Sequence, residues 1–582
     1  MTRLIQRHGP CLLGDGSCRF ALWAPDCQTV TLELADGSHL PLQAEADGWF
    51  AGACACPPGT GYRFIVDGRA VPDPASRAQL GGVHGFSQVI DHHAYGWQTE
   101  DWVGRPWHET VLYELHVGLA GGYAGVQERL PALQELGITA IELMPLAEFP
   151  GTRNWGYDGV LPFAPASAYG TPEQLKQLID SAHALGLMVF IDVVYNHFGP
   201  EGNYLGQYAS GFLRCDLQLP WGPAIDFRRG EVRDFFCENA LMWLLDYRVD
   251  GLRFDAVHAI HDRDFLVELA SRARAALPPG RHVHLVLENE DNSAELLQQG
   301  FTAQWNDDGH NVLHVLLTGE QQGYYADFSD EPTRKLARCL AEGFIYQGQR
   351  SRLGRNRGEA SGHLSPCSFV LFLQNHDQIG NRAFGERLIT LADEDALRAA
   401  TALLLLSPMI PLLFMGEEFG ATQPFLYFTD HPAELGVLVR EGRRNEFAEF
   451  PLADGVRTED IPDPNAASTY NACHVPTEAH ASATQQRWNG LYRELLALRQ
   501  RLIIPRLPGC RAIGAEVLAD AAVSAVWQLG DGNRLRIDIN LSAVAVPCKP
   551  LPTTATVIFT SASLCADERP ACLPARSLVA SL

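Results

Sequence analysis

The sequence predicts an α/β protein in which a (β/α)8 TIM barrel is flanked by an N-terminal β-sandwich and a small C-terminal β domain. With 582 residues the chain exceeds the usual size of one domain, so several domains are expected. Over residues 96–503, strand-like apolar segments alternate with amphipathic helical segments, as in parallel βα units. The flanking regions, 1–95 and 504–582, instead contain short strand-like segments separated by turn residues.

Residues 1–95 have the pattern of a small β-sandwich. Short strand-like segments at 18–25, 29–34, 48–54 and 62–68 are separated by Asp-Gly, Pro-Gly and Pro-Asp turn signals. Their aromatic residues could form a platform on which sugars stack, but at strand spacing we expect them in the core. These aromatic residues are Trp23, Trp49, Tyr62 and Phe64.

The barrel is expected to begin at Thr110. A helical segment at 126–137 separates the first two strands, and another at 172–186 precedes the third. The segment 487–502 has apolar residues at helical spacing and is expected to end the barrel domain. The eight expected strands are 110–118, 139–146, 187–197, 251–257, 284–290, 301–305, 368–377 and 411–418.

Each expected barrel strand ends in polar or charged residues. The C-terminal ends of parallel barrel strands share one rim, and such folds hold their active sites there. A barrel with only a structural role has no reason to repeat this asymmetry, so the pattern indicates an active site. The residues are Glu114, His116, Glu142, Asp192, Asn196, His197, Asp255, Glu288, Asn306, Asp307, Asp308, His376, Asp377, Glu417 and Glu418.

The fourth expected strand carries two opposite charges within an apolar run. Arg253 and Asp255 are two residues apart in the segment 251–260, so they share one face of the strand. One interpretation is an ion pair with a purely structural role. The other interpretation is a polar cavity at the rim. The positions of the remaining carboxylates distinguish the two interpretations.

Three carboxylates fit the cleavage of a glycosidic bond: Asp255, Glu288 and Asp377, after the fourth, fifth and seventh strands. Such cleavage needs one carboxylic acid that protonates the leaving oxygen and one carboxylate that meets the oxocarbenium-like carbon. We expect Asp255 to be the nucleophile, Glu288 the acid and then the base, and Asp377 a group that orients the sugar. Arg253 would keep Asp255 ionised, and the apolar run before Glu288 would favour its protonated form.

Two histidines follow asparagines at the rim, His197 after the third strand and His376 after the seventh. We expect both to contact hydroxyl groups of a substrate. A zinc site is the competing hypothesis. It is disfavoured, because a catalytic zinc needs three good ligands and the nearby carboxylates already have hydrolytic roles, so no metal is predicted.

Composition argues against several classes of partner. The formal net charge of −24 disfavours binding to nucleic acid. No apolar run is long enough for a membrane span, and the N-terminal segment lacks the apolar core of a signal peptide. We therefore expect no membrane association. The 14 cysteines include no CxxC pair, so we expect free thiols and a cytoplasmic location. The oligomeric state is not predicted.

Four ordered motifs resemble the signature regions of the α-amylase superfamily: DVVYNH at 192–197, GLRFDAVH at 251–258, Glu288 in VLENEDN, and QNHDQ at 374–378. From about residue 20 to 500 the chain is also similar to one narrower group, the malto-oligosyltrehalose trehalohydrolase family. The stretches that carry this second resemblance are 71–89, 113–118, 140–160, 199–205, 305–328, 424–431 and 441–447.

The resemblance implies an immunoglobulin-like sandwich at 1–95, a catalytic barrel at 96–503 and a β domain at 504–582. It also implies hydrolysis of the α-1,4 bond next to a terminal trehalose unit, by a retaining mechanism without a cofactor. The expected partners are malto-oligosyltrehalose and related α-glucans. By the motifs, Arg253, His197 and His376 would hold the reacting sugar and Tyr157 would be a stacking platform. Contacts to the trehalose end would come from Asp307, Asp308, His310, Arg443 and Arg444.

Two alternatives remain open. A glycogen branching enzyme resembles the chain in its N-terminal sandwich and in YELHVG and NWGYDG, at 113–118 and 154–159. It would transfer the glycosyl group to a sugar hydroxyl in place of water. The other alternative is an inactive α-glucan-binding protein, which predicts the loss of a catalytic carboxylate, whereas all three are present.

Overall fold

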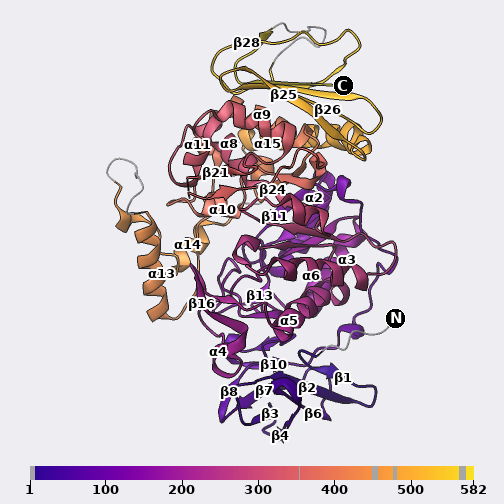
Figure 1. Cartoon of the computed structure of the whole chain (residues 1–582), viewed down its shortest axis with the longest axis vertical. Coiled ribbons are helices and arrows are strands. Elements are labelled where there is room, and N and C mark those ends of the chain that lie inside the picture. Colours follow the sequence, from indigo (N-terminus) through magenta and orange to yellow (C-terminus); the bar gives the residue numbers. More distant parts are fainter. Residues whose placement is uncertain (1–6, 353, 448–455, 476–481, 563–571) are drawn as a thin grey trace.

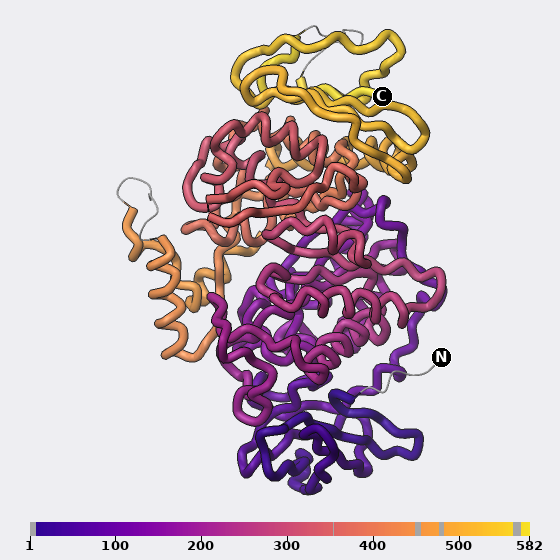
Figure 2. The backbone as a smooth tube through the Cα atoms, in the orientation of Figure 1, coloured from indigo at the N-terminus to yellow at the C-terminus, as the bar shows by residue number. Residues whose placement is uncertain are grey.

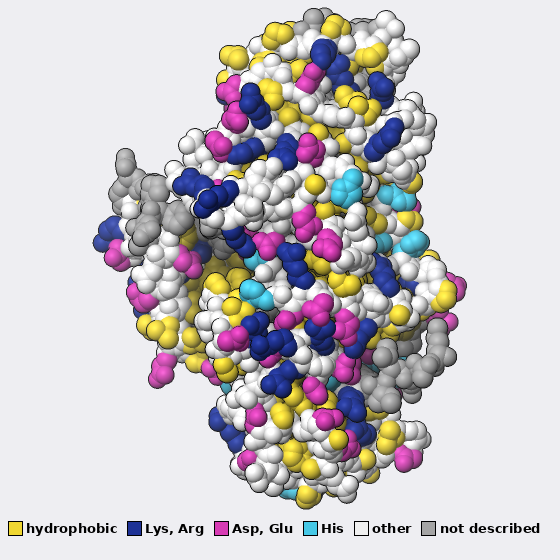
Figure 3. Space-filling model, viewed as in Figure 1, with side chains coloured by type: hydrophobic (Ala, Val, Ile, Leu, Met, Phe, Trp, Pro, Cys, Tyr) yellow, Lys and Arg dark blue, Asp and Glu magenta, His cyan; other side chains and the backbone are white. Residues whose placement is uncertain are grey.

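The computed structural model describes residues 7–352, 354–447, 456–475, 482–562 and 572–582. Figure 1 shows an elongated molecule with the N-terminal sheets at one end, the barrel in the middle and the C-terminal sheet at the other end. No helix among these residues is both long and apolar enough to span a membrane. On the face drawn in Figure 3, basic and acidic side chains are interspersed.

The centre of the molecule is the predicted closed barrel of eight parallel strands, in chain order. The strands are shorter than the apolar segments of the sequence, because the polar residues lie beyond the strand ends, at the rim. The strands are β11 (Leu112–Leu115), β12 (Ala140–Leu143), β15 (Met188–Val193), β18 (Gly251–Phe254), β19 (His284–Leu287), β20 (Ala303–Trp305), β23 (Phe369–Leu371) and β24 (Ile410–Phe414).

The helices between the strands begin and end at residues suited to those positions. Thr171 caps α3 (Pro172–Ala184) by accepting a hydrogen bond from the backbone of Gln174. Gly137 ends α2 (Gly122–Leu136) with a φ of 108°, a conformation that favours glycine. The other main helices of this region are α5 (Gly230–Leu241), α6 (Arg263–Ala276), α8 (Asp307–Thr318), α9 (Pro332–Glu342), α12 (Glu394–Leu406) and α15 (Ala483–Leu498).

The N-terminal region forms two antiparallel sheets, ordered β1-β2-β6-β5 and β4-β3-β7-β10-β9 with β8 beside β7. Trp23, Trp49, Tyr62 and Phe64 are buried in its core, as expected from their strand spacing, and so offer no sugar platform. The strands are β1 (Cys11–Leu12), β2 (Ser17–Trp23), β3 (Val30–Leu34), β4 (His39–Pro41), β5 (Gln43–Ala44), β6 (Trp49–Ala55), β7 (Gly61–Val66), β8 (Arg69–Val71), β9 (Gln79–Leu80) and β10 (Phe86–Gln88).

The C-terminal region is a sheet in the order β25-β26-β27-β31-β29, with a separate pair of β28 and β30. Helix α9 packs against β25 and β26, and α12 packs against β27 and β31, so the barrel helices cover one face of this sheet. The strands are β25 (Arg511–Ala519), β26 (Ala522–Gln528), β27 (Arg534–Asn540), β28 (Val546–Pro547), β29 (Val557–Thr560), β30 (Cys572–Leu573) and β31 (Ser577–Ser581).

Two excursions leave the barrel on the same side. One is the hairpin of β16 (Leu213–Leu219) and β17 (Gly222–Ile225). The other contains α13 (Ala433–Glu446), which Figures 1 and 2 show standing beside the main body. Arg443 anchors this helix, because its guanidinium donates to the carbonyl oxygens of Gly380 (2.6 Å) and Arg382 (3.0 Å).

Candidate active site

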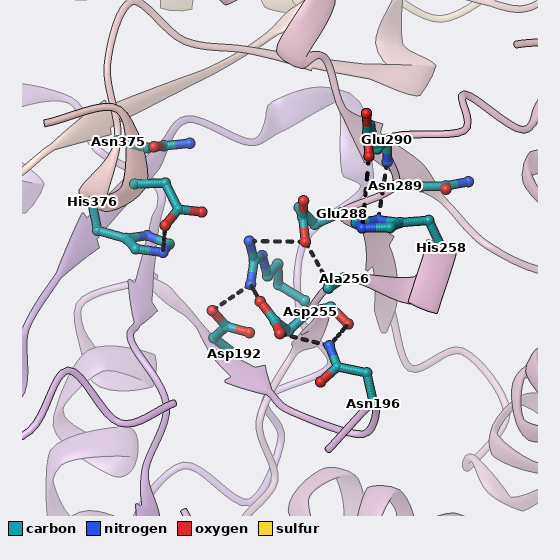
Figure 4. Close-up of polar contacts among 12 residues, drawn as sticks. Asp192, Asn196, Asp255, Ala256, His258, Glu288, Asn289, Glu290, Asn375 and His376 are labelled. Atoms are coloured by element: carbon teal, nitrogen blue, oxygen red, sulfur yellow. Dashed lines mark hydrogen bonds and ion pairs between the residues drawn. The ribbon is translucent and has the colours of Figure 1, made fainter. Parts of the chain in front are cut away.

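A buried arginine forms the floor of the site. Nη1 of Arg253 donates to Asp192 Oδ2 at 2.7 Å and to Asp255 Oδ1 at 2.8 Å (Figure 4). Burial opposes the charge of the guanidinium, but the carboxylates of Asp192 and Asp255 raise its pKa well above the ordinary value. Nδ2 of Asn196 donates to Asp255 Oδ2 at 2.8 Å, so protein groups orient both carboxylate oxygens.

Glu288 lies directly after β19 and faces the same guanidinium. Its Oε2 is 3.7 Å from Arg253 Nη2 and accepts a hydrogen bond from the backbone N–H of Ala256 at 2.5 Å (Figure 4). Burial raises the pKa of Glu288, and the charge of Asp255 adds to the increase against the opposing charge of Arg253. The carboxyl group is therefore suited to donate a proton.

Asp377 lies at the open side of the site, in the short helix α10 (His376–Gly380), and its side chain is 40% exposed. Its Oδ1 is 3.5 Å from Nε2 of His376 and accepts a hydrogen bond from Asn381 Nδ2 at 3.3 Å. The carboxylate can therefore reach a ligand bound at the rim.

Tyr157 and His376 form a second wall of the site, joined to the floor through Asp192. Their rings stack with centroids 5.1 Å apart, and the Tyr157 hydroxyl is 2.7 Å from His376 Nε2. The same hydroxyl donates to Asp192 Oδ2 at 2.6 Å, which links this wall to the Arg253 floor. The structure therefore brings together six of the residues singled out in the sequence: Arg253, Asp255, Glu288, Asp377, Tyr157 and His376.

His197 is close to this group but makes its polar contacts within the protein. Its Nδ1 contacts Asn196 Oδ1, and its Nε2 is 3.0 Å from the carbonyl oxygen of Tyr157. Burial lowers its pKa. The indole of Trp221, at the tip of the β16–β17 hairpin, stacks on the ring with centroids 5.2 Å apart and is itself 47% exposed.

The two neighbouring aspartates at the start of α8 have different environments. Asp307 is half-buried, and burial, with the charge of Glu288 as a further cause, raises its pKa well above the ordinary value, so the two carboxylates interact. Asp308 is fully buried. Its Oδ1 accepts from Arg357 at 2.8 Å, and its Oδ2 accepts from Asn292 and from the backbone N–H groups of Ile345 and Tyr346 at 2.8–2.9 Å.

These contacts correct the expectation of a sugar contact for Asp308 and His310. The carboxylate of Asp308 is saturated by donors from the surrounding chain. His310 is buried, with Nδ1 2.7 Å from the carbonyl oxygen of Leu373 and its ring stacked on Phe372. Both side chains lie behind the wall of the site.

Arg443 and Arg444 both lie on helix α13. Arg443 is the anchor described above and is buried against the backbone of 380–382, so the expectation of a sugar contact is corrected for it as well. Arg444 contacts Glu441 at 3.4 Å and the carbonyl oxygen of Glu459 at 3.3 Å, within the excursion itself.

Two residues of the site were missed as candidates in the sequence. Glu114 stood among the polar strand ends, and its signal was a charge in the otherwise apolar segment LYEL of a closed barrel. Trp221 lies in the turn LPWGP, and an aromatic residue in a polar turn was the only indication of it.

No group of three or more His, Cys, Asp and Glu side chains in the described parts of the chain could hold a metal ion.

The chain is similar to known proteins over most of its length. A model of the alpha amylase catalytic domain matches residues 94–212, and one of a domain of unknown function matches residues 510–579. A malto-oligosyltrehalose trehalohydrolase of Deinococcus radiodurans is 41% identical over 84% of this chain and 82% of its own length. A crystal structure of a Salmonella typhimurium protein with a provisional alpha amylase assignment is 43% identical, with a TM-score of 0.92 over 99% of both chains. A 1,4-alpha-glucan branching enzyme of Nitratidesulfovibrio vulgaris is 32% identical over only 48% of this chain and 49% of its own length.

Proposed function

The chain belongs to the malto-oligosyltrehalose trehalohydrolase family, and we propose that it hydrolyses the α-1,4-glucosidic bond next to the terminal trehalose unit of malto-oligosyltrehalose. The products are trehalose and a malto-oligosaccharide. The observation that carries this proposal is the arrangement of Asp255 and Glu288 around one buried guanidinium. The branching alternative has weaker support, because the matching branching enzyme covers about half of the chain.

The first chemical step needs an acid and a nucleophile on the same sugar. Glu288, whose pKa is raised, protonates the glycosidic oxygen while a carboxylate oxygen of Asp255 attacks the anomeric carbon. The bond to trehalose breaks, trehalose leaves, and the malto-oligosaccharide stays as an ester of Asp255. Both carboxylates approach the guanidinium of Arg253, at 2.8 and 3.7 Å, so they belong to one site and can act on the same sugar.

The second step releases the sugar from the enzyme. Glu288, now ionised, takes a proton from water, whose oxygen attacks the anomeric carbon and displaces Asp255. The configuration at that carbon is retained after two inversions. Arg253 stabilises the carboxylate form of Asp255 as it departs, because a cation 2.8 Å away favours the charged form.

The surrounding side chains are proposed to bind the substrate. Asp377 and His376 hold hydroxyl groups of the reacting sugar, and Tyr157 stacks on it. Asp307 is proposed to contact the trehalose end, since it is half-buried and lies near Glu288. The exposed indole of Trp221 offers a flat apolar surface for a neighbouring glucose.

The remaining expectations are retained as proposals. The chain is divided into a sandwich at 1–95, a barrel at 96–503 and a β domain at 504–582. A cytoplasmic location is likewise retained as a proposal, because the cysteine spacing of the sequence, without a CxxC pair, is that of free thiols in a reducing compartment.

The test is incubation with maltotriosyl-trehalose and, separately, with maltopentaose and amylose, followed by chromatography of the products. We expect free trehalose from the first and little change in the others. New branch points in amylose without any trehalose would identify a branching enzyme instead. The absence of every product would favour an α-glucan-binding protein.

A further inference from the structure

A buried carboxylate on the first barrel strand holds the histidine of the site. Glu114 on β11 and His376 on α10 are each 1% exposed, and they are 262 residues apart in the chain. Nδ1 of His376 contacts Glu114 Oε1, and the backbone N–H of His376 donates to Glu114 Oε2 at 3.1 Å. Glu114 therefore fixes both the ring and the backbone of His376.

The hydrogen bonds on the other side of the ring decide its protonation. The Tyr157 hydroxyl has one proton, and it donates that proton to Asp192 Oδ2 at 2.6 Å. Its oxygen must then accept from His376 Nε2, 2.7 Å away. With Nδ1 facing a carboxylate, both ring nitrogens carry protons, so the ring is an imidazolium.

The charges around this ring favour the same state. Burial lowers the pKa of His376, but the negative charge of Glu114 and then of Asp377 raises it overall to about 9. Arg253 opposes the increase. His116 adds no opposing charge, since burial, with the charge of His376 as a further cause, lowers its pKa to about 4.

A second buried glutamate in the same layer does not supply this charge. Glu142 on β12 lies beside Glu114 in the barrel register, and burial with the charges of Glu114 and Asp192 raises its pKa well above the ordinary value. The direction of this shift favours the protonated, neutral form of Glu142. Glu114 is the carboxylate that faces the imidazolium.

We propose that Glu114 is a positioning residue for the hydrolysis: it keeps His376 protonated and oriented, with Nε2–H directed toward Tyr157 and Asp377. If the ring lost its proton at Nε2, Tyr157 would have to turn its hydroxyl proton from Asp192 to His376. Asp192 would then lose one of its two donors, and the ring would lose the positive charge that it places beside Tyr157 and Asp377. The inference rests on the proposed function only for the identity of the sugar that is hydrolysed.

The first test measures the histidine itself and needs no substrate. Protein labelled with [13Cε1]histidine is titrated by NMR, and the His376 signal is identified by its absence in a His376→Asn variant. We expect a midpoint near pH 9 in the wild-type protein and a midpoint lower by more than about one pH unit in Glu114→Gln, because the paired charge is removed. Glu142→Gln is the matched control, and its midpoint should stay at the wild-type value, since a neutral group replaces a neutral group. An unchanged midpoint in Glu114→Gln would overturn the proposal.

The second test follows kcat against pH, with trehalose release as the signal. In Glu114→Gln the loss of activity on the alkaline side should move to lower pH by the same amount as the NMR midpoint. Glu114→Asp retains the charge and should retain the wild-type profile in part. A uniform loss at every pH in both variants, with an unchanged profile, would indicate a merely structural role and overturn the proposal.

A double variant separates action through His376 from other effects. In the His376→Asn background, Glu114→Gln should cause no further fall in kcat. A further fall of the same size as in the wild-type background would overturn the proposal. If no variant and no wild-type protein releases trehalose, the proposed function fails while the NMR titration still tests the role of Glu114.

Discussion

Adjacent carboxylates with different environments allow a sharp prediction about Asp308. Asp308→Asn keeps the shape of the side chain but removes its charge, which leaves Arg357 buried without its counter-ion. Breaking a buried ion pair costs about 3–5 kcal/mol, mainly because the remaining charge is uncompensated. The asparagine oxygen can still accept from the backbone of 345–346, so we expect the lower end, a loss of about 3 kcal/mol in the free energy of unfolding.

The assay is equilibrium unfolding in urea together with the kinetics of trehalose release. Asp308→Asn should lower the unfolding midpoint while KM changes less than about twofold, because Asp308 is enclosed and reaches no sugar. Asp307→Asn is the matched control on the preceding residue. It should change stability by less than about 1 kcal/mol and raise KM, because Asp307 interacts with Glu288 of the site.

The reverse pattern would refute this reasoning. A normal unfolding midpoint with a raised KM in Asp308→Asn would mean that Asp308 binds substrate, and that the backbone at 345–346 moves to admit it. A double variant with Arg357→Met adds an internal check. Removing both charges should cost less than removing either alone, because no buried charge is left unpaired.

Three further predictions concern the site. Asp255→Ala or Glu288→Gln should reduce hydrolysis by several orders of magnitude with oligosaccharide binding retained, measured by calorimetry; near-normal turnover in either would contradict the mechanism. The pKa of His376 is raised from 6.5 to about 9, so its contribution, about 3 kcal/mol, is fully present below pH 6.5 and is lost as pH rises through 9. His376→Asn should abolish this slope of the unfolding free energy, and a slope that persists would show that another group causes it. Trp221→Ala should raise KM about three- to tenfold with little change in kcat, and an unchanged KM would exclude a stacking role.

The sequence by itself determined the class of fold and the chemistry. The alternation of apolar strands and amphipathic helices predicted the barrel. In both kinds of element, the spacing of the apolar residues shows which face is buried. The position of Asp255, Glu288 and Asp377 just after strands placed them at one rim, since parallel strands end together. These are local signals that any chain of this pattern would carry.

Only the tertiary structure decided which polar side chains meet around Arg253 and which are held by other parts of the protein. Asp307 and Asp308 are neighbours in sequence, but successive helix residues point about 100° apart, so Asp307 interacts with Glu288 and Asp308 is paired with Arg357. Arg443 holds α13 in place because its guanidinium donates to the carbonyl oxygens of Gly380 and Arg382. Glu114 and His376 meet only because the closing of the barrel brings β11 beside its last strands. Such contacts depend on the register of the barrel, which joins residues hundreds of positions apart and leaves no local pattern in the chain.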